Sequence, residues 1–258
     1  MKLYAFYGGT EKGTMAAFDP FHPEVTKLVD IPYFFYLIQH PLGNVLFDTG
    51  CHPDLITDPG KRLGDAGDDF GFALDIQEGD DVVSRLAEVG LQPSDISYVV
   101  QSHLHFDHAG GIEFFPAATF YANRRELQAG FWPPPYQESI YVQADFDHPV
   151  RWQPLTGWHD LFGDGRLVIF PTPGHSPGHQ SLLVKLDNQN VILVADAAYL
   201  PRSLELGVLP AVVSSPDAMV ESWDLLKHVQ ADHDAQLIFC HDLDWRGKTL
   251  VGPDQWYE

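Results

Sequence analysis

One segment of ten residues decides how this sequence folds: Ser102-His103-Leu104-His105-Phe106-Asp107-His108-Ala109-Gly110-Gly111. It directly follows residues 97–101, an apolar run that predicts a strand. Four side chains of metal-binding type therefore stand within six residues at the end of a strand. They cannot all lie on one face of a strand, because successive side chains alternate, so the chain must turn tightly there. Gly110 and Gly111 supply the backbone freedom for such a turn.

Three further residues of metal-binding type follow predicted strands elsewhere in the sequence: His175, Asp196 and His241. A single residue at such a place usually caps a neighbouring backbone group. A cluster with three such partners is better explained by one shared metal site. Imidazole and carboxylate ligands suit zinc, iron, cobalt or manganese, and the absence of nearby thiols argues against a closed, Cys-rich structural zinc site.

The apolar patterns predict the other elements of the chain. We expect strands at 3–7, 33–40, 45–48, 97–101, 119–122, 167–171, 181–186, 191–195 and 237–240, and helices at 80–89 and 216–230. The Gly- and Asp-rich stretch 51–79 is expected to be a long loop. Two runs of strands, each interleaved with a helix, indicate stacked sheets with helices outside. No repeat or linker is evident, so we expect one domain over residues 1–258.

The ligand pattern resembles that of the metallo-β-lactamase superfamily, and Asp48-Thr49-Gly50 is similar to its early turn. The stretches 102–111, 172–181 (TPGHSPGHQS) and 196–199 (DAAY) narrow the resemblance to the N-acyl homoserine lactonases, which quench bacterial quorum signals. The resemblance spans most of the chain, in order. It implies an α/β fold, an αββα sandwich of two mixed β-sheets flanked by helices, with a two-metal site at one edge.

The resemblance also implies roles for individual residues. Seven metal ligands would form two sets joined by one carboxylate: His103, His105 and His175 for one ion, Asp107, His108 and His241 for the second, and Asp196 between them. We expect two divalent ions, zinc in the first place, with iron or cobalt as alternatives. Tyr199 matches the tyrosine that points at the substrate carbonyl in these lactonases. Tyr199 and Asp107 are therefore the expected catalytic residues.

A lactone is an uncharged ester, so ring opening needs a nucleophile at neutral pH and an acceptor for the developing charge. Metal binding lowers the pKa of water from about 16 to about 7, so a bridging hydroxide needs no side-chain base. We expect one metal and the Tyr199 hydroxyl to stabilise the oxyanion, and Asp107 to hand a proton to the leaving alkoxide. The acyl tail needs an apolar groove, for which the candidates are Phe106, Phe70, Phe72 and Met15.

Other functions match parts of the same pattern. Residues 174–178 formally fit the GxSxG serine-hydrolase motif, but a strand and not a helix is expected after Ser176. A thioesterase of the glyoxalase II type shares every ligand, although its glutathione-binding basic residues are not evident here. A lactonase acting on another ring, such as 4-pyridoxolactone or γ-butyrolactone, is the closest alternative. A non-catalytic metal-binding scaffold would not need seven ligands and a tyrosine.

Two kinds of residue next to the predicted ligands receive other roles. His179, four residues after His175, is expected to support the ligands and not to bind metal itself. Cys51 and Cys240 form no CxxC pair and are expected to be buried thiols.

The composition excludes several classes of partner. Among 258 residues, 36 are acidic and 15 are Lys or Arg, which gives a formal charge of −21. This acidity argues against binding to nucleic acid or to an anionic membrane, because phosphate contacts need clustered cations. No apolar stretch approaches the roughly 20 residues of a membrane span, and the start MKLYAFYGGT lacks a signal-peptide core. We expect a cytoplasmic protein that acts on a small lactone, and a homodimer is compatible with the sequence.

Overall fold

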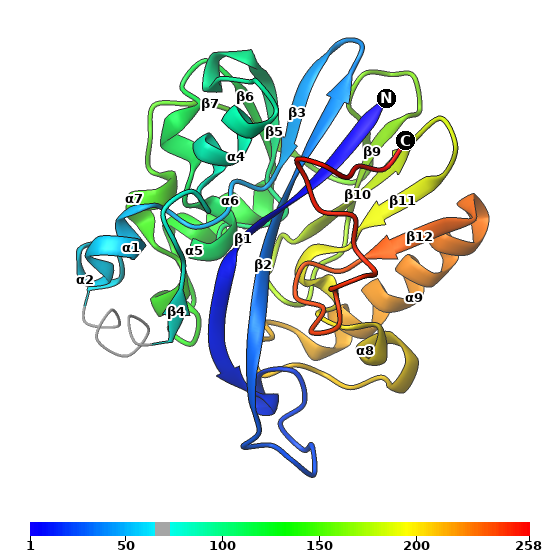
Figure 1. Ribbon diagram of the computed structural model, residues 1–258. Coiled ribbons are helices and arrows are strands. Elements are labelled where there is room, and N and C mark those ends of the chain that lie inside the picture. Colours follow the sequence, from blue (N-terminus) through cyan, green and yellow to red (C-terminus); the bar gives the residue numbers. More distant parts are fainter. Residues whose placement is uncertain (65–72) are drawn as a thin grey trace.

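The structure, a computed structural model, describes residues 1–64 and 73–258, and its strands form two stacked sheets (Figure 1). Within these residues the larger sheet has the order β4-β1-β2-β3-β5-β6-β7. Its strands are Lys2–Thr14 (β1), Leu28–His40 (β2), Gly43–Phe47 (β3), Leu74–Asp75 (β4), Ile96–Val100 (β5), Thr119–Asn123 (β6) and Arg151–Leu155 (β7). The β4-β1-β2-β3 pairs are antiparallel, whereas β3, β5, β6 and β7 run parallel, so this sheet is mixed.

The smaller sheet has the order β12-β11-β10-β9-β8 in the described part of the chain. Its strands are His159–Asp160 (β8), Leu167–Pro171 (β9), Gln180–Lys185 (β10), Asn190–Leu193 (β11) and Ala235–Ile238 (β12). The first four of these pair antiparallel, and β12 runs parallel to β11. Both sheets are therefore mixed, as the sequence predicted.

Helices cover the outer face of each sheet, with α4, α5 and α7 on the left and α9 on the right of Figure 1. The α-helices are Asp54–Thr57 (α1), Pro59–Leu63 (α2), Val82–Glu88 (α4), Phe106–Ala109 (α5), Arg124–Phe131 (α6), Gln143–Phe146 (α7), Pro201–Leu206 (α8) and Pro216–His233 (α9). Short 3-10 helices occupy Met15–Ala17 (η1), Pro93–Asp95 (η3), Ile112–Phe114 (η4), Glu138–Ile140 (η5) and Ala195–Ala197 (η6). Among the helices of the described residues, none has the length and apolar character needed to cross a membrane. The predicted αββα arrangement is confirmed.

The central strands are apolar on both faces because both faces are covered. In β2, Phe34 and Tyr36 point toward the smaller sheet, whereas Phe35 and Leu37 pack beneath the helices of the larger sheet. On the far side of the molecule, Trp223 of α9 is buried against the smaller sheet. The sandwich therefore has three apolar layers, one between the sheets and one beneath the helices of each sheet.

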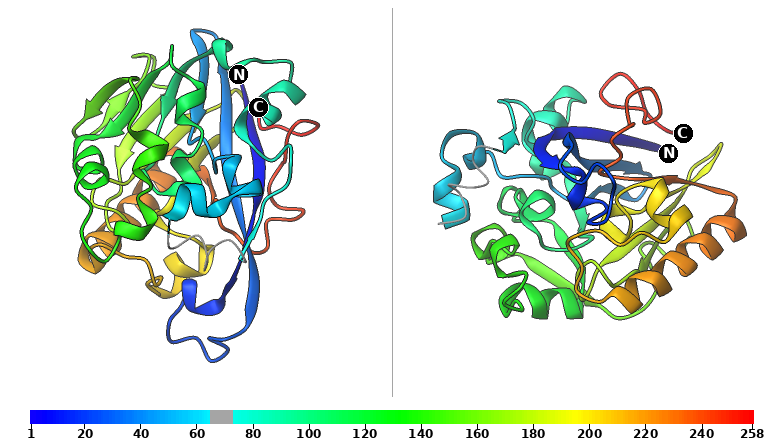
Figure 2. Two further views of the ribbon diagram at one scale, coloured as in Figure 1. Left: turned by 90° about the vertical axis from the view of Figure 1, so that its left-hand side faces the viewer. Right: turned by 90° about the horizontal axis from the view of Figure 1, so that it is seen from below.

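Strands β1 and β2 form a hairpin longer than the sequence predicted. The expected strand stopped at Gly8-Gly9, but β1 continues to Thr14 through a register shift between Tyr7 and Thr10, where Gly9 adopts a φ of 101°. A β-bulge of this kind inserts residues without ending the pairing. The hairpin extends past the body of the protein at the bottom of Figure 1 and at the bottom of the left view in Figure 2.

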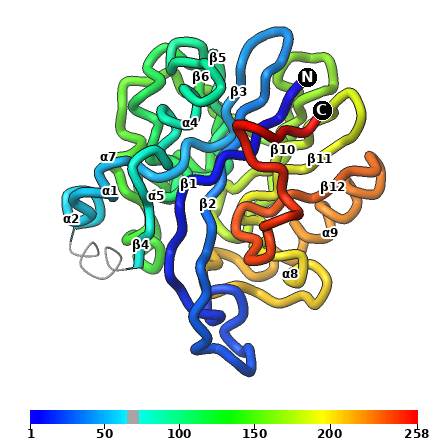
Figure 3. The backbone as a smooth tube through the Cα atoms, in the orientation of Figure 1, coloured from blue at the N-terminus to red at the C-terminus, as the bar shows by residue number. Residues whose placement is uncertain are grey.

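Two other regions add to or differ from the predictions. The expected long loop 51–79 contains α1, α2 and the short strand β4, so that prediction was partly wrong. At the other end of the chain, Tyr257 bridges to Leu3, and the two termini lie close together (Figure 3). The first strand is thereby covered by the last residues.

Gly110 is required where the histidine motif packs on the backbone of residues 50–52. A Cβ at position 110 would stand 2.2 Å from the backbone nitrogen of His52 and 2.6 Å from the carbonyl carbon of Cys51. We expect Gly110→Ala to lower the free energy of unfolding by about 2 kcal/mol or more, because backbone atoms cannot give way. Gly60→Ala in α2, where a Cβ meets only Asp58 Oδ1 at 3.6 Å, is the matched control.

Chemical denaturation measures both variants. The control should change the free energy of unfolding by less than about 1 kcal/mol, since Ala is well tolerated in a helix. Equal stabilities of the two variants would contradict the predicted clash.

Candidate metal centre

All seven predicted metal ligands lie together at one edge of the sandwich, on segments that follow β5, β9, β11 and β12. In chain order they are His103, His105, Asp107, His108, His175, Asp196 and His241. Six of them are buried, and the side chain of Asp107 is 12% exposed. The strand-end argument thus predicted which residues converge.

The first group consists of three imidazoles. His103, His105 and His175 offer ligand atoms that all lie within 4.8 Å of one another. His175 Nε2 stands 3.2 Å from His103 Nε2 and 2.9 Å from His105 Nδ1. These three nitrogens therefore surround one small space.

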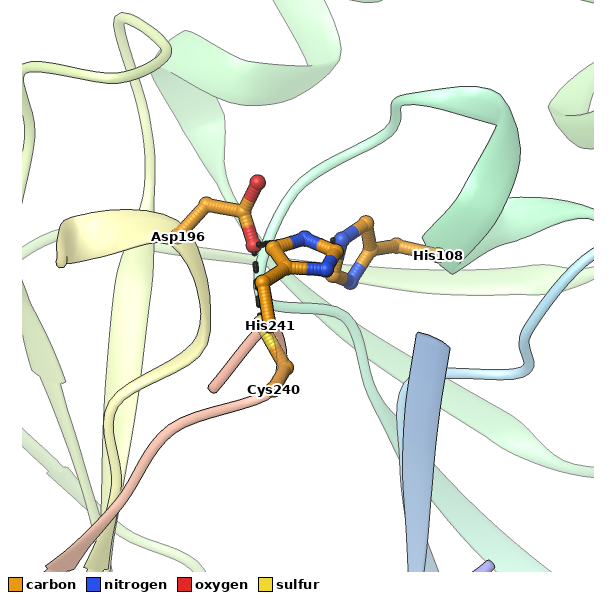
Figure 4. Close-up of side chains that lie close together, drawn as sticks. All are labelled: His108, Asp196, Cys240 and His241. Carbon is orange, nitrogen blue, oxygen red and sulfur yellow. Dashed lines mark hydrogen bonds and ion pairs between the residues drawn. The ribbon is translucent and has the colours of Figure 1, made fainter. Parts of the chain in front are cut away.

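The second group lies beside the first and contains His108, Asp196, Cys240 and His241 (Figure 4). His108 Nε2 and His241 Nε2 stand 3.2 Å and 3.1 Å from Asp196 Oδ1. Asp107 Oδ2 approaches the same two nitrogens, at 3.2 Å from His108 and 3.7 Å from His241. Together with Asp107, the second group thus places two imidazoles, two carboxylates and the Cys240 thiol around one space.

Asp196 connects the two groups. Its Oδ2 lies 3.2 Å from His175 Nε2 and 3.9 Å from His103 Nε2, whereas its Oδ1 faces the second group. The backbone N–H of Asp196 donates to His179 Nε2 at 3.0 Å. His179 therefore holds Asp196 in place, as expected of a supporting residue.

The hydrogen bonds of the imidazoles fit divalent metal ions. His175 Nδ1 and His241 Nδ1 donate to the carbonyls of Val212 and Pro32, at 3.1 Å and 2.8 Å, so Nε2 is the ring nitrogen that each leaves to bind a cation at the centre. Facing lone pairs repel unless a cation lies between them. The distances of 3.2 Å and 2.9 Å from His175 Nε2 to the nitrogens of His103 and His105 are close to the roughly 3.3 Å edge of a tetrahedron with zinc–nitrogen bonds of about 2.05 Å. His108 Nε2 is buried and makes no well-directed hydrogen bond, although two carboxylate oxygens lie 3.2 Å from it, which supports the same conclusion.

The protonation states also suit a bound cation. Burial lowers the pKa of His103 and of His105 well below the usual histidine range, so both imidazoles are neutral, as metal ligands must be. Burial also opposes charge on His108, but Asp107, Asp196 and Asp48 raise its pKa well above the usual value. These carboxylates supply the negative charge that a metal ion would balance.

Asp48 and Thr49 attach the histidine motif to the end of β3. Asp48 accepts hydrogen bonds from the Ser102 backbone N–H (2.7 Å), the Ser102 hydroxyl (2.8 Å) and His108 Nδ1 (2.9 Å). Thr49 donates to the carbonyl of His108 at 3.0 Å and accepts from the N–H of Gly111. The sequence pointed to this turn by resemblance, and the structure adds its task, which is to orient His108.

Glu126 of α6 is a buried residue that the sequence analysis did not identify. Its carboxylate accepts four hydrogen bonds, from the backbone N–H groups of Leu104 and Gly178 (both 3.0 Å) and from the hydroxyls of Tyr141 (2.9 Å) and Ser176 (2.6 Å). Burial raises the pKa of Glu126, and these donors oppose that shift. Glu126 thereby joins the two loops that carry the first group of histidines.

The position of Ser176 decides one alternative. Its hydroxyl is fully buried and donates to Glu126, so its proton is not held by a histidine base. The GxSxG match therefore does not mark a serine nucleophile, which agrees with the strand β10 that follows it.

A cavity of about 280 Å³ opens onto the metal-binding side chains. One side is formed by His105, Asp107, His175, Asp196, Tyr199 and His241, and the other by mostly apolar residues of β1, η1, β2 and the segment around Val212. Phe106 also lines this cavity, which fits its predicted contact with substrate. Phe70 and Phe72, also predicted to contact substrate, lie outside the described residues.

Met15 and Tyr199 belong to one buried apolar cluster beside this cavity. Phe18 and Ile31 complete the buried part of that cluster, and Met15 is not among the residues that line the cavity. The Tyr199 side chain is buried but borders the cavity, with its hydroxyl 3.3 Å from His175 Nδ1. Burial and the Asp196 carboxylate raise the pKa of Tyr199 well above its usual value, so its hydroxyl keeps its proton. Contact of Met15 with substrate stays a prediction.

The family model of the metallo-beta-lactamase superfamily matches residues 30–241, a range that includes all seven predicted ligands. The chain therefore belongs to the metallo-beta-lactamase superfamily. This agrees with the sandwich and with the position of the metal-binding groups at its edge.

Its relatives include N-acyl homoserine lactonases. The chain is 40% identical over 221 residues to the N-acyl homoserine lactonase AttM of Rhizobium radiobacter, with 83% of each chain covered. It is 30% identical over 230 residues to AiiA of Bacillus thuringiensis subsp. kurstaki, with 88% of each covered. A solved N-acyl homoserine lactone hydrolase with N-hexanoyl-L-homoserine at its catalytic metal centre superimposes with a TM-score of 0.85 at 27% identity, covering 99% of this chain and 98% of that one. The family resemblance drawn from the motifs is confirmed.

Removal of Glu126 should destabilise this edge of the fold. We expect Glu126→Ala to lower the free energy of unfolding by about 3 kcal/mol or more, because four buried donors lose their acceptor. Glu126→Gln keeps the shape and one oxygen and should cost less. Glu221→Ala, at an exposed position of α9, is the control and should change stability by less than about 0.5 kcal/mol. Urea unfolding curves measure all three, and a small loss for Glu126→Ala would contradict the role assigned to Glu126.

Asp196 and Cys240 differ in their expected effect on metal content. Cys240 Sγ donates to Asp196 Oδ1 at 3.0 Å, and burial together with Asp196 raises the pKa of the thiol well above its usual value. Cys240 is therefore expected to stay a buried thiol that supports Asp196. Asp196→Ala should lower the metal bound per chain by at least half, whereas Cys240→Ser should leave it unchanged. Elemental analysis after dialysis tests this, and a loss of metal from Cys240→Ser would make Cys240 a ligand.

Proposed function

We propose that this chain hydrolyses N-acyl homoserine lactones, opening the lactone ring with water and the help of two divalent metal ions. The observation that carries the proposal is a cavity that joins metal-binding side chains to an apolar wall. An uncharged ester with an aliphatic tail has both properties that such a cavity selects. The identity of 40% to a lactonase with this substrate in its name supports the choice.

The metal ions are proposed to be held by His103, His105 and His175 on one side, by Asp107, His108 and His241 on the other, and by Asp196 between them. Such a centre supplies a nucleophile from water at neutral pH and positive charge for the developing oxyanion. We propose zinc, because nitrogen and carboxylate ligands suit it, and iron or cobalt would be compatible with the same side chains. A cytoplasmic location and a homodimer stay predictions from the sequence.

Tyr199 is proposed to act on the carbonyl oxygen of the lactone. His175 Nδ1 already donates to Val212, so the Tyr199 hydroxyl does not need to give its proton to His175. It can therefore donate to the carbonyl oxygen and bind it more strongly as negative charge develops there. The ring of Tyr199 is held by an edge contact with Phe18 at 5.7 Å and by one with His241 at 5.1 Å.

Asp107 is proposed to carry the proton that ring opening requires. It borders the cavity and is the most exposed of the predicted ligands. One carboxylate oxygen can take the proton that water releases and deliver it to the leaving alkoxide of the lactone. Water is thereby divided between the new carboxylic acid and the new hydroxyl of the opened product, and the acid then releases its proton to solvent at neutral pH.

Loss of the Tyr199 hydroxyl should slow ring opening and leave metal binding intact. We expect Tyr199→Phe to lower kcat on N-hexanoyl homoserine lactone about 10- to 100-fold with little change in KM, because the hydrogen bond strengthens in the transition state. Tyr136→Phe, at an exposed tyrosine, is the control and should match the parent chain. A pH-stat assay at equal metal content measures both variants, and full activity of Tyr199→Phe would remove Tyr199 from the mechanism.

The same assay tests the substrate class. The parent chain should open acyl homoserine lactones faster than it hydrolyses a glutathione thioester. A faster thioester reaction would overturn the proposed function in favour of a thioesterase.

A further inference from the structure

The cavity contains a polar pair that the proposed mechanism does not use. Glu11 of β1 and Tyr33 of β2 both line it, together with Asp107 and His241. The Tyr33 hydroxyl donates to Glu11 Oε2 at 2.8 Å. Its ring is 2% exposed and is held edge-on between Phe106 (6.4 Å) and His241 (5.8 Å). This pair is therefore a rigid part of the wall that faces the predicted metal site.

Glu11 has no counter-ion among the described residues, whereas its neighbour Lys12 pairs with Asp30 on the exposed side of the hairpin. One Glu11 oxygen accepts from Tyr33, and apart from the metal-binding side chains the surrounding wall is mostly apolar, with groups such as Phe18, Ile31 and Val212. An ionised carboxylate only accepts hydrogen bonds. A ligand that fills the cavity removes the other oxygen from water, so binding is weakened unless the ligand brings a donor.

The proposed substrate brings one such donor. An N-acyl homoserine lactone with an unsubstituted chain has a single hydrogen-bond donor, its amide N–H, and the lactone ring and tail have none. On the basis of the proposed function, we propose that Glu11 Oε1 accepts this N–H and that Tyr33 positions the carboxylate for it. The Glu11–Tyr33 pair would then select lactones with an acylamino group over lactones of the same size with a plain alkyl chain.

The experiment compares two substrates on matched variants. One substrate is N-hexanoyl homoserine lactone, and the other is a γ-butyrolactone with an alkyl chain of equal length on the same ring carbon. Glu11→Leu should lower kcat/KM for the first substrate about 10- to 100-fold, mainly through KM, because a hydrogen bond to a charged group is lost. It should change kcat/KM for the second substrate less than about threefold, because that substrate has no N–H to lose.

Three further variants complete the test. Tyr33→Phe should lower kcat/KM on the acylamino substrate by a smaller factor, since the carboxylate remains but loses its support. Glu11→Gln, which keeps the size of the side chain, should fall between the parent and Glu11→Leu and covers the case in which Glu11→Leu does not fold. Asp30→Asn removes an exposed carboxylate from the same hairpin and should leave kcat/KM unchanged for both substrates.

The outcomes separate this inference from the proposed function. An equal loss on both substrates would make Glu11 a general contributor to chemistry or folding and would overturn the inference. If Glu11→Leu and Glu11→Gln kept the parent's preference for the acylamino lactone over the alkyl lactone, the inference would be overturned as well, while the lactonase function would stand. Failure of the parent chain to open N-hexanoyl homoserine lactone would overturn the proposed function and this inference with it.

Discussion

The carboxylate of Asp196, placed between two sets of imidazole nitrogens, is the interaction on which the rest of the site depends. Its two oxygens face different groups, so a shift of either group changes the surroundings of the other. The participating residues come from segments that are far apart in the chain and meet only because the strands before them end at one edge. In the first group, the ring nitrogens of His103 and His105 lie about 3 Å from that of His175. Such an arrangement is stable when a cation lies among the nitrogens.

Two buried acids hold the loops of this edge in place. Asp48 fixes the start of the histidine motif and the ring of His108, and Glu126 joins that motif to the loop of His175. A buried carboxylate is tolerated in such a position only when donors surround it. Asp48 accepts three hydrogen bonds and Glu126 four. These bonds offset the cost of burying each carboxylate, and they also fix the positions of the loops that carry the ligands.

The sequence predicted the sandwich and the converging residues, because alternating apolar runs and strand-end ligands are local patterns. Glu126 left no such signal, since its four partners meet it only in the folded chain. Strand β7 was missed because Arg151–Leu155 contains Pro154 and the polar residues Arg151 and Gln153, a composition suited to the edge position that it occupies. The pair of glycines in β1 suggested an end to the strand, whereas the structure uses them for a bulge.

The hairpin of β1 and β2 has a consequence for how such a protein can diversify. Much of the described wall that a substrate would touch comes from one contiguous stretch, from Glu11 to Tyr33, with further contributions from Phe106, Ile140 and the segment around Val212, whereas the metal-binding groups lie beyond residue 100. A large part of substrate recognition is therefore encoded apart from the reactive centre. A recombination event or a cluster of mutations confined to this hairpin could alter which molecules are accepted while the reactive centre is inherited intact.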